Sequence, residues 1–434
     1  MIRDRRAILA LLTGLNFLNY IDRAVIAAIL EPMAKELALS NFQAGLLNSA
    51  FLIGYFATSP LFGLRADKTA RKGLIALGVA IWSVATVASG FAPGLWTLLA
   101  ARVVVGIGEA SFVVLAPTII DDMVEPARKG TALAVFLLAL PLGYALGYIL
   151  GGAIGAHWGW RAAFLVCGGP GIALALLCLL IVEPARKLAD PKARLVDGLR
   201  EISRVPLFRR AVLGYIAFNA AAGAFSFWAP NFLVERFPEG LTLKTANFWF
   251  GVVLIVAGAV GTIVGGWWSD RRIRRLRQPA PGAPHDAPEH KAAVNQMLRV
   301  SAIGMIVAAP FTALCFLMPV AWGFFAAAFI VELGLFLSNS PVNIAMMRAV
   351  PSERRASAVA ANVFAIHLFG DLWSAAALGL LLDHLDREIA MMSLPLTFAW
   401  SAYLWWPRTR EATGRSDPTV VGSQLPEARV HDST

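Results

Sequence analysis

The stretch GLRADKTARK at residues 63–72 returns 203 residues later as GWWSDRRIRR at residues 266–275. In both stretches an acid stands four residues before a pair of basic residues. A second pair of similar segments is RKGTALA at residues 128–134 and RRASAVA at residues 354–360. Duplication of this kind is typical of transporters built from two parallel halves. The sequence therefore predicts two similar halves that carry the same loops.

The composition is that of a membrane protein. Of 434 residues, 58% are hydrophobic and 15% are charged, whereas soluble domains carry about 25% charged residues. Apolar runs long enough for one bilayer crossing occur twelve times, and a lipid-exposed run must be helical to satisfy its own backbone. The predicted fold is therefore all-α, with twelve transmembrane helices in two pseudo-symmetric six-helix bundles. The expected spans cover residues 7–30, 42–64, 73–91, 95–118, 130–154, 161–182, 211–233, 247–268, 298–318, 320–345, 356–382 and 388–406.

Basic residues set the predicted topology. With a cytoplasmic N-terminus, 31 of the 38 Lys and Arg residues fall in cytoplasmic segments, five in outside loops and two in spans. The net charge of +10 is thus topogenic and does not indicate a nucleic-acid partner. We expect a multi-pass protein of a bacterial-type inner membrane with both termini cytoplasmic. The expected domains are an N-terminal bundle (1–182), a cytoplasmic linker (183–210), a C-terminal bundle (211–406) and a flexible cytoplasmic tail (407–434).

The repeated loops resemble motif A of the major facilitator superfamily. RVVVGIGEA at residues 102–110 is similar to its motif B, and GYALGYILGG at residues 143–152 is similar to its motif C. Tyr148 stands where motif C usually has proline, and Ala70 where motif A has glycine. The resemblance covers essentially the whole chain and implies the superfamily fold. It also implies a conformational latch on the cytoplasmic side, formed by Asp67, Arg71, Lys72, Asp270 and Arg274.

Within that superfamily, several stretches resemble the spinster group of lysolipid and sphingolipid-phosphate transporters. They are NFLNYIDR (16–23), LLNSAFLIGY (46–55), VGIGEAS (105–111), FWAP (227–230) and GD (370–371). The resemblance implies a proton-coupled secondary transporter of lysophospholipids or related anionic amphiphiles. A transporter of hydrophilic organic anions or drugs on the same fold is the alternative, since a fold does not choose a substrate. A sensor or membrane enzyme is disfavoured, because nucleotide-binding and hydrolase motifs are absent from the sequence.

Ionisable side chains inside spans are the strongest functional candidates, because a charge at the bilayer centre costs at least about 2.5 kcal/mol. Asn16, Asn19, Asp22 and Arg23 form one polar stripe on the first span. We expect Arg23 to alternate between carboxylates and an anionic headgroup, and so to change their affinity for protons.

Arg102 and Glu109 share a face of the fourth span, with Gly106 and Gly108 between them to let a neighbouring helix approach. The predicted proton-coupling residues are Asp22, Glu109, Arg23 and Arg102. The alternative is a static bridge that holds helices together, either Asp22 with Arg102 or Arg23 with Glu109.

The second half offers fewer candidates. Glu332 and Asn339 lie seven residues apart on the tenth span, and His367 and Asp371 share a face of the eleventh. Aromatic residues are either lining or packing residues. The predicted substrate-binding residues are Arg23, Asn16, Asn19, Glu109, Tyr55, Glu332, His367 and Trp228. We expect protons, membrane lipids and an amphiphilic substrate as partners, a monomer, and neither metal nor cofactor.

Overall fold

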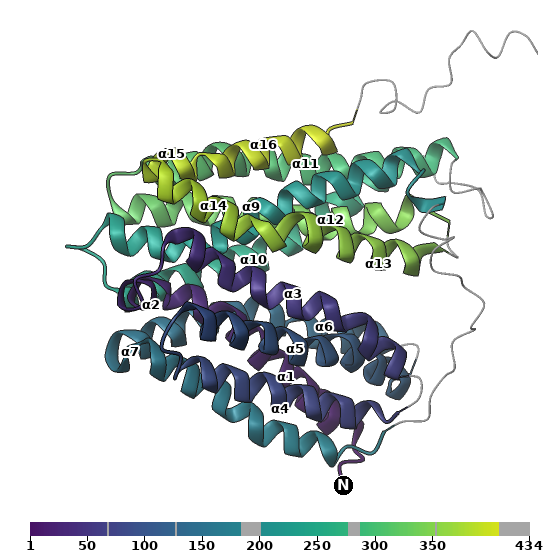
Figure 1. The fold of residues 1–434 in the computed structure, drawn as a ribbon. Helices are drawn as coiled ribbons and strands as arrows, with labels where there is room; N and C mark the ends of the chain where they lie inside the picture. Colours follow the sequence, from purple (N-terminus) through teal and green to yellow (C-terminus); the bar gives the residue numbers. More distant parts are fainter. Residues whose placement is uncertain (67–68, 126–127, 184–200, 277–286, 352–353, 408–434) are drawn as a thin grey trace, which may run out of the picture.

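The computed structural model describes residues 1–66, 69–125, 128–183, 201–276, 287–351 and 354–407. Its helices form two bundles, one from each half of the chain (Figure 1). The first half contains α1 (Arg5–Ala28), α2 (Leu30–Glu36), α3 (Asn41–Ala66), α4 (Arg71–Ser89), α5 (Leu95–Met123), α6 (Lys129–Leu137) and α7 (Ala139–Leu179). The second contains α9 (Pro206–Arg236), α10 (Leu243–Ile273), α11 (Pro288–Leu317), α12 (Ala321–Arg348), α13 (Arg355–Ile366), the π-helix η3 (His367–Asp371), α14 (Leu372–His384), α15 (Arg387–Met391) and α16 (Ser393–Trp405).

These helices confirm the twelve predicted crossings. Among the described residues, nine helices are long and apolar enough to span a membrane. One of them, Thr131–Leu179, is 49 residues long and holds two crossings, because Gly159 leaves the helical conformation at φ +82°, where glycine is tolerated best. The charged α1 and the interrupted pair of α15 and α16 make up the remaining two crossings.

The junction at Gly159 is attached to α2 by a polar contact. Trp160 Nε1 donates to Glu36 Oε2 over 2.7 Å, and Arg161 forms an ion pair with the same carboxylate. The hydrogen bonds from Trp160 and Arg161 hold the pKa of Glu36 below its usual range. The short helix α2 is therefore fixed beside the turn between two crossings.

Glycines set the spacing inside the first bundle. A Cβ on Gly106 would lie 2.0 Å from the carbonyl oxygen of Phe51, and a Cβ on Gly108 would lie 2.5 Å from that of Gly78. Helix α5 therefore packs backbone to backbone against α3 and α4, as the sequence predicts for small residues in a membrane helix. This close packing brings the charged residues of α5 next to those of neighbouring helices.

The two bundles meet mainly through α3 against α14 and α7 against α10. At one end of this interface Asp383 caps the N-terminus of α3, accepting from the backbone N–H of Asn41 at 2.8 Å and of Phe42 at 2.9 Å. A carboxylate at a helix N-terminus also interacts favourably with the helix dipole. We call this end of the molecule the closed end.

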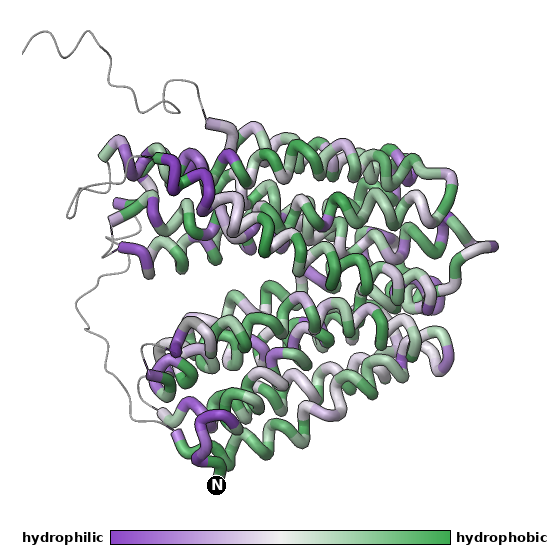
Figure 2. The backbone as a smooth tube through the Cα atoms, turned by 180° about the vertical axis from the view of Figure 1, so that it is seen from behind, coloured by the Kyte–Doolittle hydropathy of each residue, from purple (hydrophilic) through white to green (hydrophobic). Residues whose placement is uncertain are grey.

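At the opposite end the helices of the two bundles diverge (Figures 1 and 2). This is the end at which α3 stops and α4 begins, and it carries the repeated basic loops; we call it the basic end. Figure 2 shows hydrophilic stretches gathered near the helix ends, with hydrophobic stretches between them. The backbones of the two bundles thus diverge at the end that the charge pattern predicts to be cytoplasmic.

The tight contact at Gly106 predicts a large difference between two Gly→Ala substitutions in helices. Gly106→Ala would place a methyl group against the Phe51 carbonyl, and overpacking of this kind costs about 1–3 kcal/mol. Gly14→Ala is the matched control, since a Cβ there meets nothing within 4 Å. We expect a lower apparent unfolding temperature in detergent only for Gly106→Ala; equal values would contradict the backbone contact.

The cap on α3 predicts that Asp383 stabilises the closed end. Asp383→Asn keeps one acceptor but loses the charge, and should weaken closure by about 1–2 kcal/mol. Spin labels on the exposed residues Lys35 and Glu239 would report the separation of the halves by electron–electron distance measurement. We expect a longer-distance population in Asp383→Asn and none in the neighbouring control Asp386→Asn. An unchanged distribution would remove Asp383 from the closure.

Candidate substrate and proton-coupling site

The structure brings the four predicted charged residues of the first half into one cluster. Arg23 Nε and Glu109 Oε2 form an ion pair of 2.8 Å between α1 and α5. Asp22, Arg102 and Glu109 are each at most 1% exposed. The side chain of Arg23 is 16% exposed, which makes it the most accessible of the four. Of the two ion pairs that the sequence allows, the structure contains Arg23–Glu109, in which Arg23 is partly exposed and Glu109 is buried.

The other two charges are not joined by an ion pair. Asp22 Oδ2 accepts a hydrogen bond of 2.6 Å from Thr86 on α4, and Arg102 lies within electrostatic range of Asp22 and Glu109. Within the described part of the chain, Nε and Nη1 of Arg102 have no hydrogen-bond partner. Two acids and two bases cancel in net charge, which limits the cost of burial. The unmatched donors leave room for a different pairing.

Aromatic rings surround the Arg23 guanidinium. Its Cζ atom lies 4.9 Å from the ring centroid of Phe51 and 5.4 Å from those of Tyr20 and Tyr55. A cation over such rings is stabilised by about 0.5–2 kcal/mol. Tyr55 is a predicted site residue, whereas Tyr20 is not, although it lies inside the quoted segment 16–23. The rings provide an apolar wall beside an accessible positive charge.

The two asparagines of the polar stripe face the interior of the first bundle. Asn16 is 2% exposed and donates through Nδ2 to the carbonyl oxygen of Phe136 at 2.9 Å. Asn19 is completely buried and lies beside Glu109. The amide nitrogen of Asn16 is thus engaged in helix packing, and substrate binding by either residue stays a prediction.

Across the interface, His367 and Asp371 form the pair that the sequence predicts. His367 Nδ1 lies 2.7 Å from Asp371 Oδ2, and both belong to the π-helix η3, an element common at functional sites. The His367 ring centroid is 5.6 Å from that of Phe56 on α3. Asp371 is also within electrostatic range of Arg23. Charges of the two halves therefore face one another where the bundles meet.

Deeper in the second half, Glu332 on α12 is 2% exposed. Its Oε1 atom has no hydrogen-bond partner among the described residues. Asn339, seven residues on, instead accepts a hydrogen bond of 2.7 Å from the Tyr215 hydroxyl. Glu332 and Asn339, seven residues apart on one helix, thus differ in their contacts. Asn339 is hydrogen-bonded to Tyr215, whereas Oε1 of Glu332 has no hydrogen-bond partner among the described residues.

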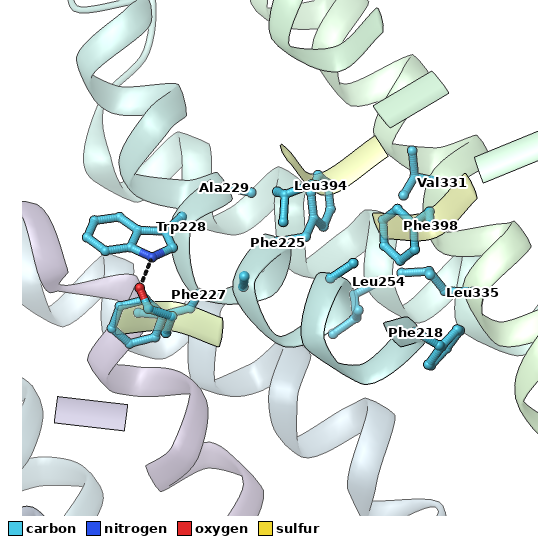
Figure 3. Close-up of a cluster of buried hydrophobic side chains, with 14 of the residues drawn as sticks. Phe218, Phe225, Phe227, Trp228, Ala229, Leu254, Val331, Leu335, Leu394 and Phe398 are labelled. Carbon is cyan, nitrogen blue, oxygen red and sulfur yellow. Dashed lines mark hydrogen bonds between the residues drawn. The ribbon is translucent and has the colours of Figure 1, made fainter. Parts of the chain in front are cut away.

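Trp228 has a packing contact in this structure. It is 1% exposed, and its Nε1 donates to the carbonyl oxygen of Ala375 at 3.0 Å (Figure 3). Figure 3 shows the indole beside Phe227, at one side of the apolar cluster that includes Phe225 and Phe398. Both its ring and its donor are occupied, so Trp228 joins α9 to α14. Its substrate-binding role stays a prediction that this geometry does not support.

The predicted latch residues lie at the basic end. Arg71 donates to Asp122 Oδ2 at 2.7 Å, Glu183 Oε1 at 2.8 Å and Thr118 Oγ1 at 3.1 Å. Lys72 donates to the carbonyl oxygen of Ile181 at 2.8 Å. These contacts stay inside the first half, where they fasten the start of α4 to the ends of α5 and α7. Asp270 and Arg274 are exposed at the end of α10, and Asp67 lies outside the described residues.

The fork at Arg71 predicts that arginine is required there. Arg71→Gln removes two charge-assisted contacts, each worth about 1.5–3 kcal/mol, and should lower the apparent unfolding temperature. Arg71→Lys keeps the charge but loses the planar guanidinium, so its apparent unfolding temperature should lie between those of the wild type and Arg71→Gln. The three cysteines are buried and free, so a thiol-reactive dye can follow unfolding. Arg65→Gln, at an exposed position, is the control; equal destabilisation by both Gln variants would contradict the assignment.

Comparison with known proteins agrees with this architecture. Residues 12–373 match the Major Facilitator Superfamily. The sphingosine-1-phosphate transporter of Danio rerio is 32% identical over 400 residues, covering 86% of this chain and 75% of the relative. Protein spinster homolog 1 of Homo sapiens is 31% identical over 407 residues, covering 88% of this chain and 74% of the relative.

Among solved structures, a bacterial homologue of the human lysosomal transporter Spinster, in an inward-facing and unoccupied conformation, superposes with a TM-score of 0.79. It is 23% identical, and the match covers 95% of this chain and 99% of that one, so it has the same fold. The chain is thus a multi-pass membrane transporter that belongs to the major facilitator superfamily and, within it, to the spinster family.

Proposed function

We propose that the protein is a secondary active transporter of lysophospholipids or related anionic amphiphilic lipids, coupled to protons and working by alternating access. Relatives named as transporters of sphingosine 1-phosphate and of sphingolipids support a substrate with a charged headgroup and a long chain. The proposed setting is a bacterial-type inner membrane, with both termini cytoplasmic and the chain acting as a monomer.

The observation that carries the proposal is the Arg23–Glu109 ion pair, in which the base is partly exposed and the acid is buried. A guanidinium binds phosphate through two parallel hydrogen bonds, and the surrounding rings of Tyr20, Phe51 and Tyr55 are apolar surfaces for the adjoining chain. Arg23 therefore suits the headgroup of an anionic amphiphile.

Proton coupling follows from competition for Arg23. When the guanidinium turns to a headgroup, Glu109 remains buried without its counter-charge, and burial then favours the protonated carboxylic acid. Arg102 lies within electrostatic range of both Glu109 and Asp22. In the proposed mechanism, the departure of Arg23 from Glu109 therefore also changes the electrostatic environment of Asp22. Substrate binding and proton binding thus require each other through one movable side chain.

The ends of the molecule fit an alternating cycle. The closed end is held by Asp383 of α14, which caps the N-terminus of α3, and the helices of the two bundles diverge at the basic end (Figure 2). In the proposed cycle, the site is reached from the cytoplasm through the basic end. Re-closure of the basic end would bring the motif A residues Asp67, Arg71, Lys72, Asp270 and Arg274 of the two halves toward each other. Their proposed role is to latch that closed state.

Glu109→Gln tests the coupling in proteoliposomes with radiolabelled lysophospholipid. A one-unit pH gradient coupled to one proton supports up to about tenfold accumulation, since a tenfold ratio corresponds to about 1.4 kcal/mol. We expect Glu109→Gln to retain gradient-free exchange and to lose this accumulation, while the exposed control Glu239→Gln keeps both.

The outcomes separate the elements of the proposal. A pH response retained in Glu109→Gln would remove this residue from proton coupling. Exchange lost in Arg23→Gln but kept in Arg209→Gln is expected for headgroup binding, since Arg209 is exposed at the start of α9. Flux of hydrophilic organic anions without lysolipid flux in the wild type would favour the alternative substrate class.

A further inference from the structure

A small basic pocket lies at the basic end of the second half, away from the charged cluster of α1 and α5. Its volume is about 290 Å³, at the lower limit of typical ligand pockets. It is formed where α10 ends and α11 passes. The lining residues are Trp268, Arg271, Arg272, Arg275, Leu276 and Gln296.

Among the residues that the structure describes, the pocket holds positive charge without a matching acid. Three of its six described lining residues are arginines and none is acidic, and Arg299 adds a further like charge beside Arg272. Within the described residues, Arg272 Nε is buried without a hydrogen-bond partner, and Nη1 makes only a long contact of 3.4 Å to Gln296 Oε1. Clustered like charges with unused donors are stabilised by a bound anion.

Tryptophans place this pocket at headgroup depth. The Arg271 guanidinium lies 5.4 Å from the ring centroid of Trp267, and that of Arg299 lies 5.3 Å from Trp406. Trp267 is 55% exposed and Trp406 is 42% exposed, at the ends of apolar helices. Exposed tryptophan beside arginine at a helix end is characteristic of the membrane–water interface. A membrane lipid is therefore the source of anion that this surface meets.

We propose that this pocket binds the phosphate headgroup of an anionic phospholipid from the leaflet at the basic end. The volume admits a headgroup and leaves the acyl chains outside, along the exposed face of Trp267. Basic pockets between transmembrane helices are suited to such headgroups. The bound lipid neutralises the arginines and fixes the end of α10 to the membrane surface, at a site separate from the proposed transport pathway.

The test is thermal stabilisation of the detergent-purified full chain by dioleoyl phosphatidylglycerol, compared with dioleoyl phosphatidylcholine and with inorganic phosphate. We expect stabilisation at lower concentrations of phosphatidylglycerol than of the other two. Arg272→Gln/Arg275→Gln should weaken the apparent affinity by about 25-fold, since each arginine near an anionic surface contributes about fivefold. Arg209→Gln removes a charge at the same end outside the pocket and should leave the affinity unchanged.

Three results would overturn the proposal. They are equal stabilisation by phosphatidylcholine, equal stabilisation by inorganic phosphate, which would make this a free-anion site, and an unchanged response in the double variant. If the double variant does not fold, native mass spectrometry of the single variant Arg275→Gln replaces it. The single variant should retain fewer phosphatidylglycerol adducts than Arg209→Gln, and equal retention would also refute the site.

Discussion

The ion pair between Arg23 and Glu109 is the interaction on which the proposed mechanism depends. A carboxylate that is fully buried in a membrane protein needs a counter-charge or a proton. Glu109 has the counter-charge, at 2.8 Å, from a side chain that still reaches accessible surface. The buried carboxylate of Glu109 must therefore be neutralised, either by a nearby base or by a bound proton. In the proposed mechanism, an anionic ligand that attracts Arg23 leaves Glu109 to be neutralised by a proton.

The rest of the first half keeps this pair in place. Close packing of α5 at Gly106 and Gly108 brings Glu109 toward α1, and the Thr86 hydroxyl holds Asp22 against α4. At the basic end, Arg71 joins the start of α4 to the ends of α5 and α7. These contacts join the helices of the bundle to one another, and Arg23 is the most exposed of its four clustered charges. In transporters with alternating access, bundles move largely as rigid bodies.

Much of the architecture can be predicted from the sequence because bilayer thickness fixes helix length and the repeated loops reveal two halves. The charged cluster can be predicted for a related reason, since Asp22, Arg23, Arg102 and Glu109 each carry a cost that only a partner offsets. Burying a neutral polar side chain in the membrane costs less free energy, so the neutral partners of these charges are harder to predict from the sequence.

Thr86 and Tyr20 therefore leave no comparable signal, and their positions depend on how helices rotate against one another. The same limit explains Trp228, whose type suits a lining residue but whose donor is taken by a backbone carbonyl. The π-helix at residues 367–371 and the break at Gly159 also depend on packing that hydropathy does not record.

Helix α1 connects the charged cluster to the contact between the halves. It carries Asp22 and Arg23, and one and a half turns later the carbonyl oxygen of Ala28 accepts a hydrogen bond of 3.0 Å from Asn247 on α10. Nearby, the Tyr148 hydroxyl, which stands where motif C usually has proline, donates to the carbonyl oxygen of Ser226 at 2.6 Å. The ion pair of Arg23 and the contact with Asn247 are therefore made by the same helix. In the proposed cycle, α1 is accordingly where binding chemistry and the movement of the bundles meet.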